Sequence, residues 1–242
     1  MSPGSPAPGS AAPQCGECPG SAAPQCGECD GEKLPETRPP TRGWYSRGYL
    51  PHLDSPHVIQ HLSYRLEDSL PTAVLERIEA AIRREIKDPK TRDIELRKRI
   101  EDYLDAGHGS CILREPPVAA CIVDTWLHFD GTRYRLLEWV AMPNHCHVLI
   151  EPLPGVALAT IVLSWKNYTA RFINRLRGGL PDGAGAHGQV WQREYWDRYI
   201  RNDQHLAAAR QYIRMNPVKA GLVKTPEDWP WSSAGMGIRR DA

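Results

Sequence analysis

Two histidines separated by one residue, His145 and His147, are the first side chains in this sequence that could do chemistry. Residues 146–151, together with His145 just before them, are predicted to form a β-strand. In a strand, alternate residues project from the same face about 7 Å apart. Two imidazoles at that spacing can bind one divalent metal ion. A partly buried histidine pair with ordinary hydrogen bonds would show the same pattern, so a second feature has to support the metal site.

That second feature is Tyr212 followed four residues later by Asn216, within a predicted helix over 203–216. Residues four apart lie on one face of a helix, so the hydroxyl and the amide can face one site together. A phenol with a pKa near 10 is a weak nucleophile at neutral pH, but a metal ion that polarises a phosphodiester makes attack by the hydroxyl feasible. Asn216 would supply a carbonyl oxygen as a third metal ligand. A tyrosine that merely packs in the core remains the alternative.

A basic segment surrounds these residues although the net charge of the chain is only +1. Between Lys166 and Lys224 there are eleven Lys and Arg residues against four acidic residues, an excess of seven positive charges that favours a phosphate-binding surface. Within it, five residues are candidates for DNA contact by stacking or by phosphate binding: Trp191, Arg193, Trp196, Arg198 and Arg201. The alternative is that the tryptophans are core residues and the arginines only solvated. Tyr168, Tyr195 and Tyr199 compete with Tyr212 for the role of nucleophile because they also lie in basic surroundings.

The elements that must position these residues follow from the hydrophobic patterns. Strands are predicted over 57–65, 134–142 and 146–151, and helices over 72–86, 92–104, 118–129, 158–176 and 203–216. Strands and helices in this succession predict an α+β fold, a ferredoxin-like antiparallel sheet with helices packed on it.

The length of 242 residues fits one catalytic domain, which we place at 44–235, between a tail over 1–43 and a short tail over 236–242. Residues 1–43 are low in complexity and contain a duplicated Cys-Gly-Glu-Cys repeat (Cys15 to Cys18 and Cys26 to Cys29). We interpret this segment as a disordered tail, with a zinc site of four thiolates as the alternative. No apolar run is long enough to span a membrane and no secretory signal is evident, so a cytoplasmic location is expected.

Four blocks of sequence together resemble the REP-associated tyrosine transposases, relatives of the single-tyrosine HUH transposases of bacterial insertion sequences. These blocks are PNHCHVLIEP (143–152), VWQREYWDRYIR (190–201), YIRMNPVKAGLV (212–223) and WPWSS (229–233). In that family, the two histidines bind a divalent ion and the tyrosine of the Tyr-x-x-x-Asn helix attacks DNA. The resemblance implies that His145, His147 and Asn216 are metal ligands and that Tyr212 is the catalytic nucleophile.

The resemblance also implies an activity: cleavage and rejoining of single-stranded DNA at palindromic repeat hairpins, through a 5′-phosphotyrosine intermediate, with Mg²⁺ or Mn²⁺ as cofactor. Two other functions stay open, a catalytically inactive hairpin-binding regulator and a metal-dependent hydrolase that uses water as its nucleophile. Monomer and homodimer are both compatible with the family. Three features depart from its pattern: Cys146 in the hydrophobic position between the histidines, the N-terminal repeat, and the insertion-like acidic helices between about 72 and 104.

Overall fold

The computed structural model describes residues 43–46, 51–55, 57–178 and 188–237. Its centre is a four-stranded antiparallel sheet in the order β4-β5-β3-β6, with strands β3 (Gln60–Arg65), β4 (Tyr134–Ala141), β5 (His145–Pro152) and β6 (Trp196–Tyr199). Strand β5 pairs with β4 on one side and with β3 on the other. The predicted α+β class with an antiparallel sheet is therefore confirmed.

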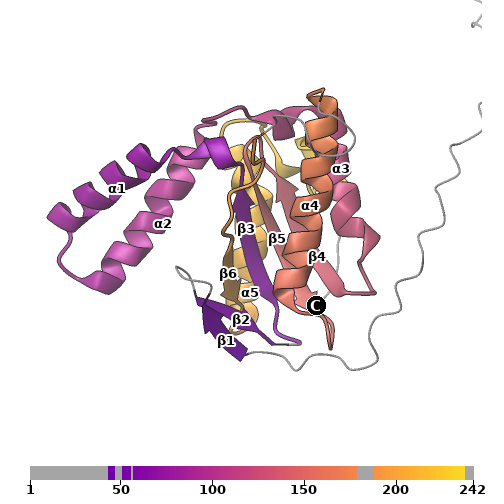
Figure 1. Cartoon of the computed structure of the whole chain (residues 1–242). Coiled ribbons are helices and arrows are strands. Elements are labelled where there is room, and N and C mark those ends of the chain that lie inside the picture. Colours follow the sequence, from indigo (N-terminus) through magenta and orange to yellow (C-terminus); the bar gives the residue numbers. More distant parts are fainter. Residues whose placement is uncertain (1–42, 47–50, 56, 179–187, 238–242) are drawn as a thin grey trace, which may run out of the picture. The chain divides into compact units, whose positions relative to one another are not determined.

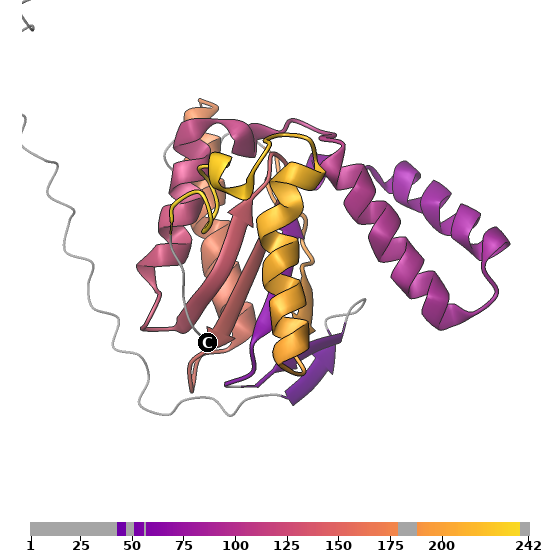
Figure 2. The ribbon, with the colours of Figure 1, turned by 180° about the vertical axis from the view of Figure 1, so that it is seen from behind.

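Three long helices cover the two faces of this sheet (Figures 1 and 2). Helices α3 (Pro116–His128) and α4 (Leu158–Leu176) pack against each other on one face, and α5 (Asp203–Lys219) crosses the opposite face over β4 and β5. The four strands and the two helices of the first face follow one another along the chain as β3, α3, β4, β5, α4 and β6, so each of these helices lies between two strands of the sheet. This is the ferredoxin-like arrangement.

Strand β6 is not among the strands predicted from the sequence, which left the aromatic and basic residues 190–201 without a regular element between two helices. Four of them pair with β3, from Ser63 opposite Trp196 to Gln60 opposite Tyr199. The segment lacks a clean alternation of apolar and polar residues because it is an edge strand, and only one side of an edge strand is held by backbone hydrogen bonds.

Strand β5 shows how the sequence separates core from site. Successive side chains of a strand point to opposite faces of the sheet. Cys146, Val148 and Ile150 therefore enter the larger apolar cluster under α3 and α4, while His145 and His147 face the side that α5 covers.

The larger cluster is built on aromatic side chains whose polar atoms are satisfied inside it. Trp126 Nε1 donates to Tyr64 Oη at 2.9 Å, and Trp165 Nε1 donates to Tyr134 Oη at 3.0 Å. Buried indole and phenol groups need such partners, since an unpaired buried polar group is costly. These contacts link β3 and β4 to the helices above them.

Two hairpins lie outside this layered body of the chain. Helices α1 (Thr72–Glu85) and α2 (Pro89–Asp105) form an antiparallel pair that joins β3 to α3, and short strands β1 (Gly43–Ser46) and β2 (Pro51–Asp54) pair with each other. Asp88 caps α2 by accepting from Thr91 N at 2.8 Å. The C-terminal end of α2 is tied to the turn before β5, where Asn144 Nδ2 donates to Leu104 O at 3.1 Å.

Short 3₁₀ helices, η1 (Glu67–Ser69), η2 (Ile112–Arg114) and η3 (Pro226–Asp228), connect the main elements. After η3 the chain packs along the edge of β4: Trp229 Nε1 donates to Ala141 O at 2.9 Å, and Ser233 N donates to Trp139 O at 3.0 Å. Gly235 fits here because a Cβ at its position would lie 1.9 Å from Trp229 O.

The tail predicted over 1–43 and its cysteine repeat lie outside the described residues, apart from Gly43, and so do 238–242. Among the helices that the structure describes, none combines the length and the apolar character needed to cross a membrane.

Candidate active site

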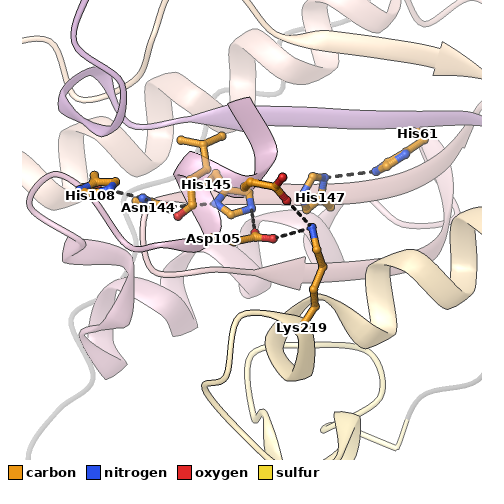
Figure 3. Close-up of polar contacts among 9 residues, drawn as sticks. His61, Asp105, His108, Asn144, His145, His147 and Lys219 are labelled. Atoms are coloured by element: carbon orange, nitrogen blue, oxygen red, sulfur yellow. Dashed lines mark hydrogen bonds and ion pairs between the residues drawn. The ribbon is translucent and has the colours of Figure 1, made fainter. Parts of the chain in front are cut away.

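The two histidines of β5 lie side by side on the face of the sheet that carries α5, and both are buried, with 1% of each exposed. Their ring centroids are 4.9 Å apart. His145 Nδ1 contacts Asn144 Oδ1 at 2.7 Å, and His147 Nδ1 lies 3.3 Å from His61 Nε2 on the neighbouring strand (Figure 3). In each ring the Nδ1 atom faces a neighbouring side chain, which leaves Nε2 as the atom that can bind a ligand.

Helix α5 brings Tyr212 against this pair. The Tyr212 ring centroid is 5.2 Å from that of His147 and 5.8 Å from that of His61. Asn216, one turn further along the same face, is buried close to the Tyr212 hydroxyl, although no hydrogen bond of regular geometry joins them. The spacing of four residues therefore places the hydroxyl and the amide together, as the sequence predicted.

Burial keeps the histidines of this site neutral. It lowers the pKa of His145 to about 3 and that of His61 to about 4, and it holds the pKa of His147 well below its usual value, with nearby His145 and His61 adding to the effect. A neutral imidazole is the form that binds a metal ion.

Several buried polar atoms at this site have no hydrogen-bond partner. They are His147 Nε2, both side-chain polar atoms of Asn216, the Tyr212 hydroxyl oxygen and Asp105 Oδ1. Buried polar atoms are nearly always paired in folded proteins, so this group of unpaired polar atoms, all but Asn216 Nδ2 able to accept, points to a site for a bound ligand. Nitrogen and oxygen acceptors around two neutral histidines fit a divalent cation.

The set of side chains differs from a site made only of histidine, cysteine and carboxylates. In the part of the chain that the structure describes, no three such residues are arranged to hold a metal ion. The candidate ligand set depends on the amide of Asn216 as its third member.

Helix α2 contributes two carboxylates that the sequence did not point to. Asp105 Oδ1 lies 3.8 Å from His145 Nε2, while its Oδ2 forms an ion pair with Lys219 Nζ at 3.0 Å (Figure 3). Glu101 interacts with the Tyr212 hydroxyl, although no hydrogen bond of regular geometry forms there. Burial raises the pKa of both carboxyl groups.

A cavity of about 280 Å³ opens beside Tyr212. Tyr212 and Glu101 lie in its wall together with residues of β3, β6, α2 and α5, and the positively charged groups among them are Arg97 and Arg198. The cavity wall therefore brings Tyr212 together with two guanidinium groups, which suit an anionic phosphodiester, and with the carboxylates of Glu101 and Asp197.

The five candidates for DNA contact divide into two groups. Trp191 is 4% exposed, donates from Nε1 to Thr169 Oγ1 at 2.9 Å and packs against Tyr64, so it is a core residue, as in the alternative that the sequence left open. Arg193, Arg198 and Arg201 are exposed. Trp196 is partly buried on β6, with the Arg97 guanidinium 4.8 Å from its ring.

Lys166 also differs from a surface cation. It is 8% exposed, and its ammonium group donates to the backbone oxygens of Gln192, Arg193 and Glu194 at 2.9, 3.2 and 3.1 Å. This lysine fixes the chain that leads into β6.

The competing tyrosines lie away from the histidines. Tyr168 is 60% exposed on α4, on the other side of the sheet, and Tyr195 is buried in the larger core cluster. Tyr199 lies on the edge strand with the Arg201 guanidinium 5.4 Å from its ring. Of the four tyrosines considered, Tyr212 is the one in ring contact with His147.

Comparison with known proteins gives the class of the central segment. Residues 128–216 match the family model described as "Transposase IS200 like", a range that runs from the end of α3 to Asn216 and includes both histidines and Tyr212. This segment is therefore similar in sequence to the IS200-like transposases.

Within that class, the relatives are REP-associated tyrosine transposases. The Escherichia coli protein of that name is 28% identical over 107 residues, which cover 44% of this chain and 58% of the relative. A Haemophilus influenzae protein provisionally given the same name is 50% identical over 109 residues, or 41% of this chain and 58% of the relative. The matched part thus spans less than two thirds of either curated relative. The resemblance that the four sequence blocks indicated is confirmed.

A solved structure, that of a REP-associated tyrosine transposase bound to a REP hairpin, aligns with 79% of this chain and 82% of its own, with a TM-score of 0.45 and 16% identity.

Proposed function

We propose that this protein is a metal-dependent single-tyrosine DNA transposase that cleaves and rejoins single-stranded DNA at palindromic repeat hairpins. The observation that supports this most directly is the contact between Tyr212 and His147, because it puts a nucleophile beside a pair of neutral imidazoles with an unpaired Nε2. A hydrolase that uses water would not need a tyrosine at that place.

In this proposal, His145, His147 and Asn216 hold a Mg²⁺ or Mn²⁺ ion. When bound, such an ion polarises the scissile phosphate and offsets its negative charge. The chain's own residues bind and orient the strand: Arg97 and Arg198 contact phosphate oxygens in the cavity, and Arg193 and Arg201 extend this contact along β6 and beyond it.

The reaction begins when the Tyr212 oxygen attacks phosphorus. A bond between that oxygen and phosphorus forms, the bond from phosphorus to the 3′ oxygen breaks, and a 5′-phosphotyrosine and a free 3′-hydroxyl result. A 3′-hydroxyl from a second strand then reverses the step and releases Tyr212. The phosphotyrosine keeps the bond energy, so rejoining needs no nucleotide cofactor.

The test is to incubate the whole chain with single-stranded hairpin DNA from the flanks of its own gene in the presence of Mg²⁺ or Mn²⁺. We expect a protein–DNA adduct that survives denaturation, with the nucleotide on Tyr212 in peptide mass spectrometry. Hairpin binding with no adduct would support a catalytically inactive DNA-binding regulator instead. An adduct on Tyr168, Tyr195 or Tyr199 would keep the class of enzyme and refute the assignment of Tyr212.

A further inference from the structure

A nucleophilic tyrosine must lose its proton as it attacks, and the candidate metal ligands leave no obvious acceptor for that proton. Asn216 is an amide and cannot accept it at neutral pH. His147 has one ring nitrogen facing His61, and its other nitrogen is a proposed ligand atom. Asp105 is paired with Lys219 at 3.0 Å.

His61 also lies near the Tyr212 ring, but its Nε2 faces His147 and its pKa is lowered to about 4, which makes it a weak base. Helix α2 supplies the stronger candidate. Glu101 and Tyr212 lie in the wall of the same cavity of about 280 Å³, and the Glu101 carboxyl interacts with the Tyr212 hydroxyl. Among the ion pairs in the described part of the chain, none engages Glu101. We propose that Glu101 is a catalytic residue of the proposed transposase and accepts the proton that the Tyr212 hydroxyl loses as its oxygen attacks phosphorus.

The charges around the pair are consistent with this role. Burial, together with the nearby Glu101 and Asp105 carboxylates, raises the pKa of Tyr212, so the phenol stays protonated until a substrate arrives. Burial also raises the pKa of Glu101, despite the nearby Lys219 ammonium, which makes its carboxylate a stronger base than an exposed glutamate. Asp102 and Asp105 add further negative charge on the same helix.

The proton balance closes over the whole reaction. During cleavage, the phenol proton moves to Glu101 while the leaving 3′ oxygen takes a proton from water. During rejoining, the incoming 3′-hydroxyl gives up its proton to water, and Glu101 returns its own to the departing Tyr212 oxygen. Glu101 therefore ends each cycle ionised, as it began.

This inference rests on the proposed function and also reaches beyond it, because α2 lies outside the 128–216 segment that matches the transposase family. Helix α2, to which the sequence analysis assigned no function, would thus complete the active site.

The test compares single-turnover rates of adduct formation for the wild-type chain, Glu101→Gln and Glu95→Gln. Glu95 is the matched control, since it also lies on α2 but forms an ion pair with Arg99 at 2.8 Å and does not line the cavity. For Glu101→Gln we expect a rate lower by about 10²-fold or more, with hairpin affinity and thermal unfolding unchanged. Its rate should recover as pH rises, because hydroxide can replace the missing base, and Glu101→Asp should retain part of the activity.

Three results would overturn the proposal. A wild-type adduct with an equal rate in Glu101→Gln would refute the role of Glu101 and leave the transposase proposal standing. Equal loss of affinity and rate in Glu101→Gln would show that the side chain serves binding or folding. No adduct in the wild-type chain, with bound hairpin and divalent metal, would refute the proposed function and the role of Glu101 together.

Discussion

Replacing Lys166 with methionine tests whether the strand that borders the cavity is held by a buried cation. The change keeps the length and apolar stem of the side chain but leaves the backbone oxygens of Gln192, Arg193 and Glu194 without their donor. Hydrogen bonds to charged groups contribute about 1.5–3 kcal/mol each, so three amount to at least about 4–5 kcal/mol. Removing a buried charge returns part of this, and we expect a net loss of about 2–4 kcal/mol of unfolding free energy.

Urea unfolding monitored by tryptophan fluorescence measures this loss, and a thermal melt should show a Tm lower by about 5–15 °C for a domain of this size. Arg171→Met is the control, because Arg171 is exposed on the same helix and its replacement should change stability by no more than about 0.5 kcal/mol. The salt dependence of hairpin binding should not change in Lys166→Met, since a buried ammonium contacts no phosphate. A loss below about 1 kcal/mol would refute the conclusion that this lysine anchors the segment.

Two further substitutions separate chemistry from binding. Tyr212→Phe should abolish the covalent adduct. Its unfolding free energy should stay within about 1 kcal/mol of the wild-type value, because the hydroxyl makes no regular hydrogen bond. Tyr168→Phe is the control and should keep the adduct, whereas an adduct that persisted in Tyr212→Phe would contradict the assignment. His147→Ala should lose nicking but keep hairpin affinity, since phosphate contacts supply most of that affinity. Divalent metal at about a hundred times its dissociation constant should stabilise the wild-type chain by about 2.7 kcal/mol and leave His147→Ala unchanged, and an equal shift in both would place the ion elsewhere.

Much of the fold follows from local sequence patterns. Helix α4 begins and ends at the predicted residues, 158 and 176, because its apolar residues recur at helical spacing over the full length. The alternation in β5 likewise placed His145 and His147 on one face. Strand β6 was not predicted. An edge strand of four residues is stabilised by pairing with its partner β3, and its own sequence shows little hydrophobic alternation.

Only part of the candidate site could be predicted from the sequence, for a similar reason. Helix periodicity can relate Tyr212 to Asn216, but it cannot reveal that a helix more than a hundred residues earlier brings Glu101 to the same hydroxyl. Nor does the identity of a residue show its burial: Trp191 and Lys166 both lie in the basic segment between residues 166 and 224, yet both are interior residues. Such contacts arise from tertiary packing, and the sequence encodes them through the whole fold.

The two faces of the sheet differ in how firmly their helices are attached. Among the described residues, the cluster beneath α5 contains six buried hydrophobic residues, whereas α3 and α4 share a much larger aromatic one. Free energies of local opening rise with such burial, so we expect α5 to open in partial unfolding before α3 and α4 do. The helix that carries Tyr212, the proposed nucleophile, therefore packs on the smaller of the two apolar clusters, and a DNA strand end attached to Tyr212 would be held by the more weakly packed face of the sheet.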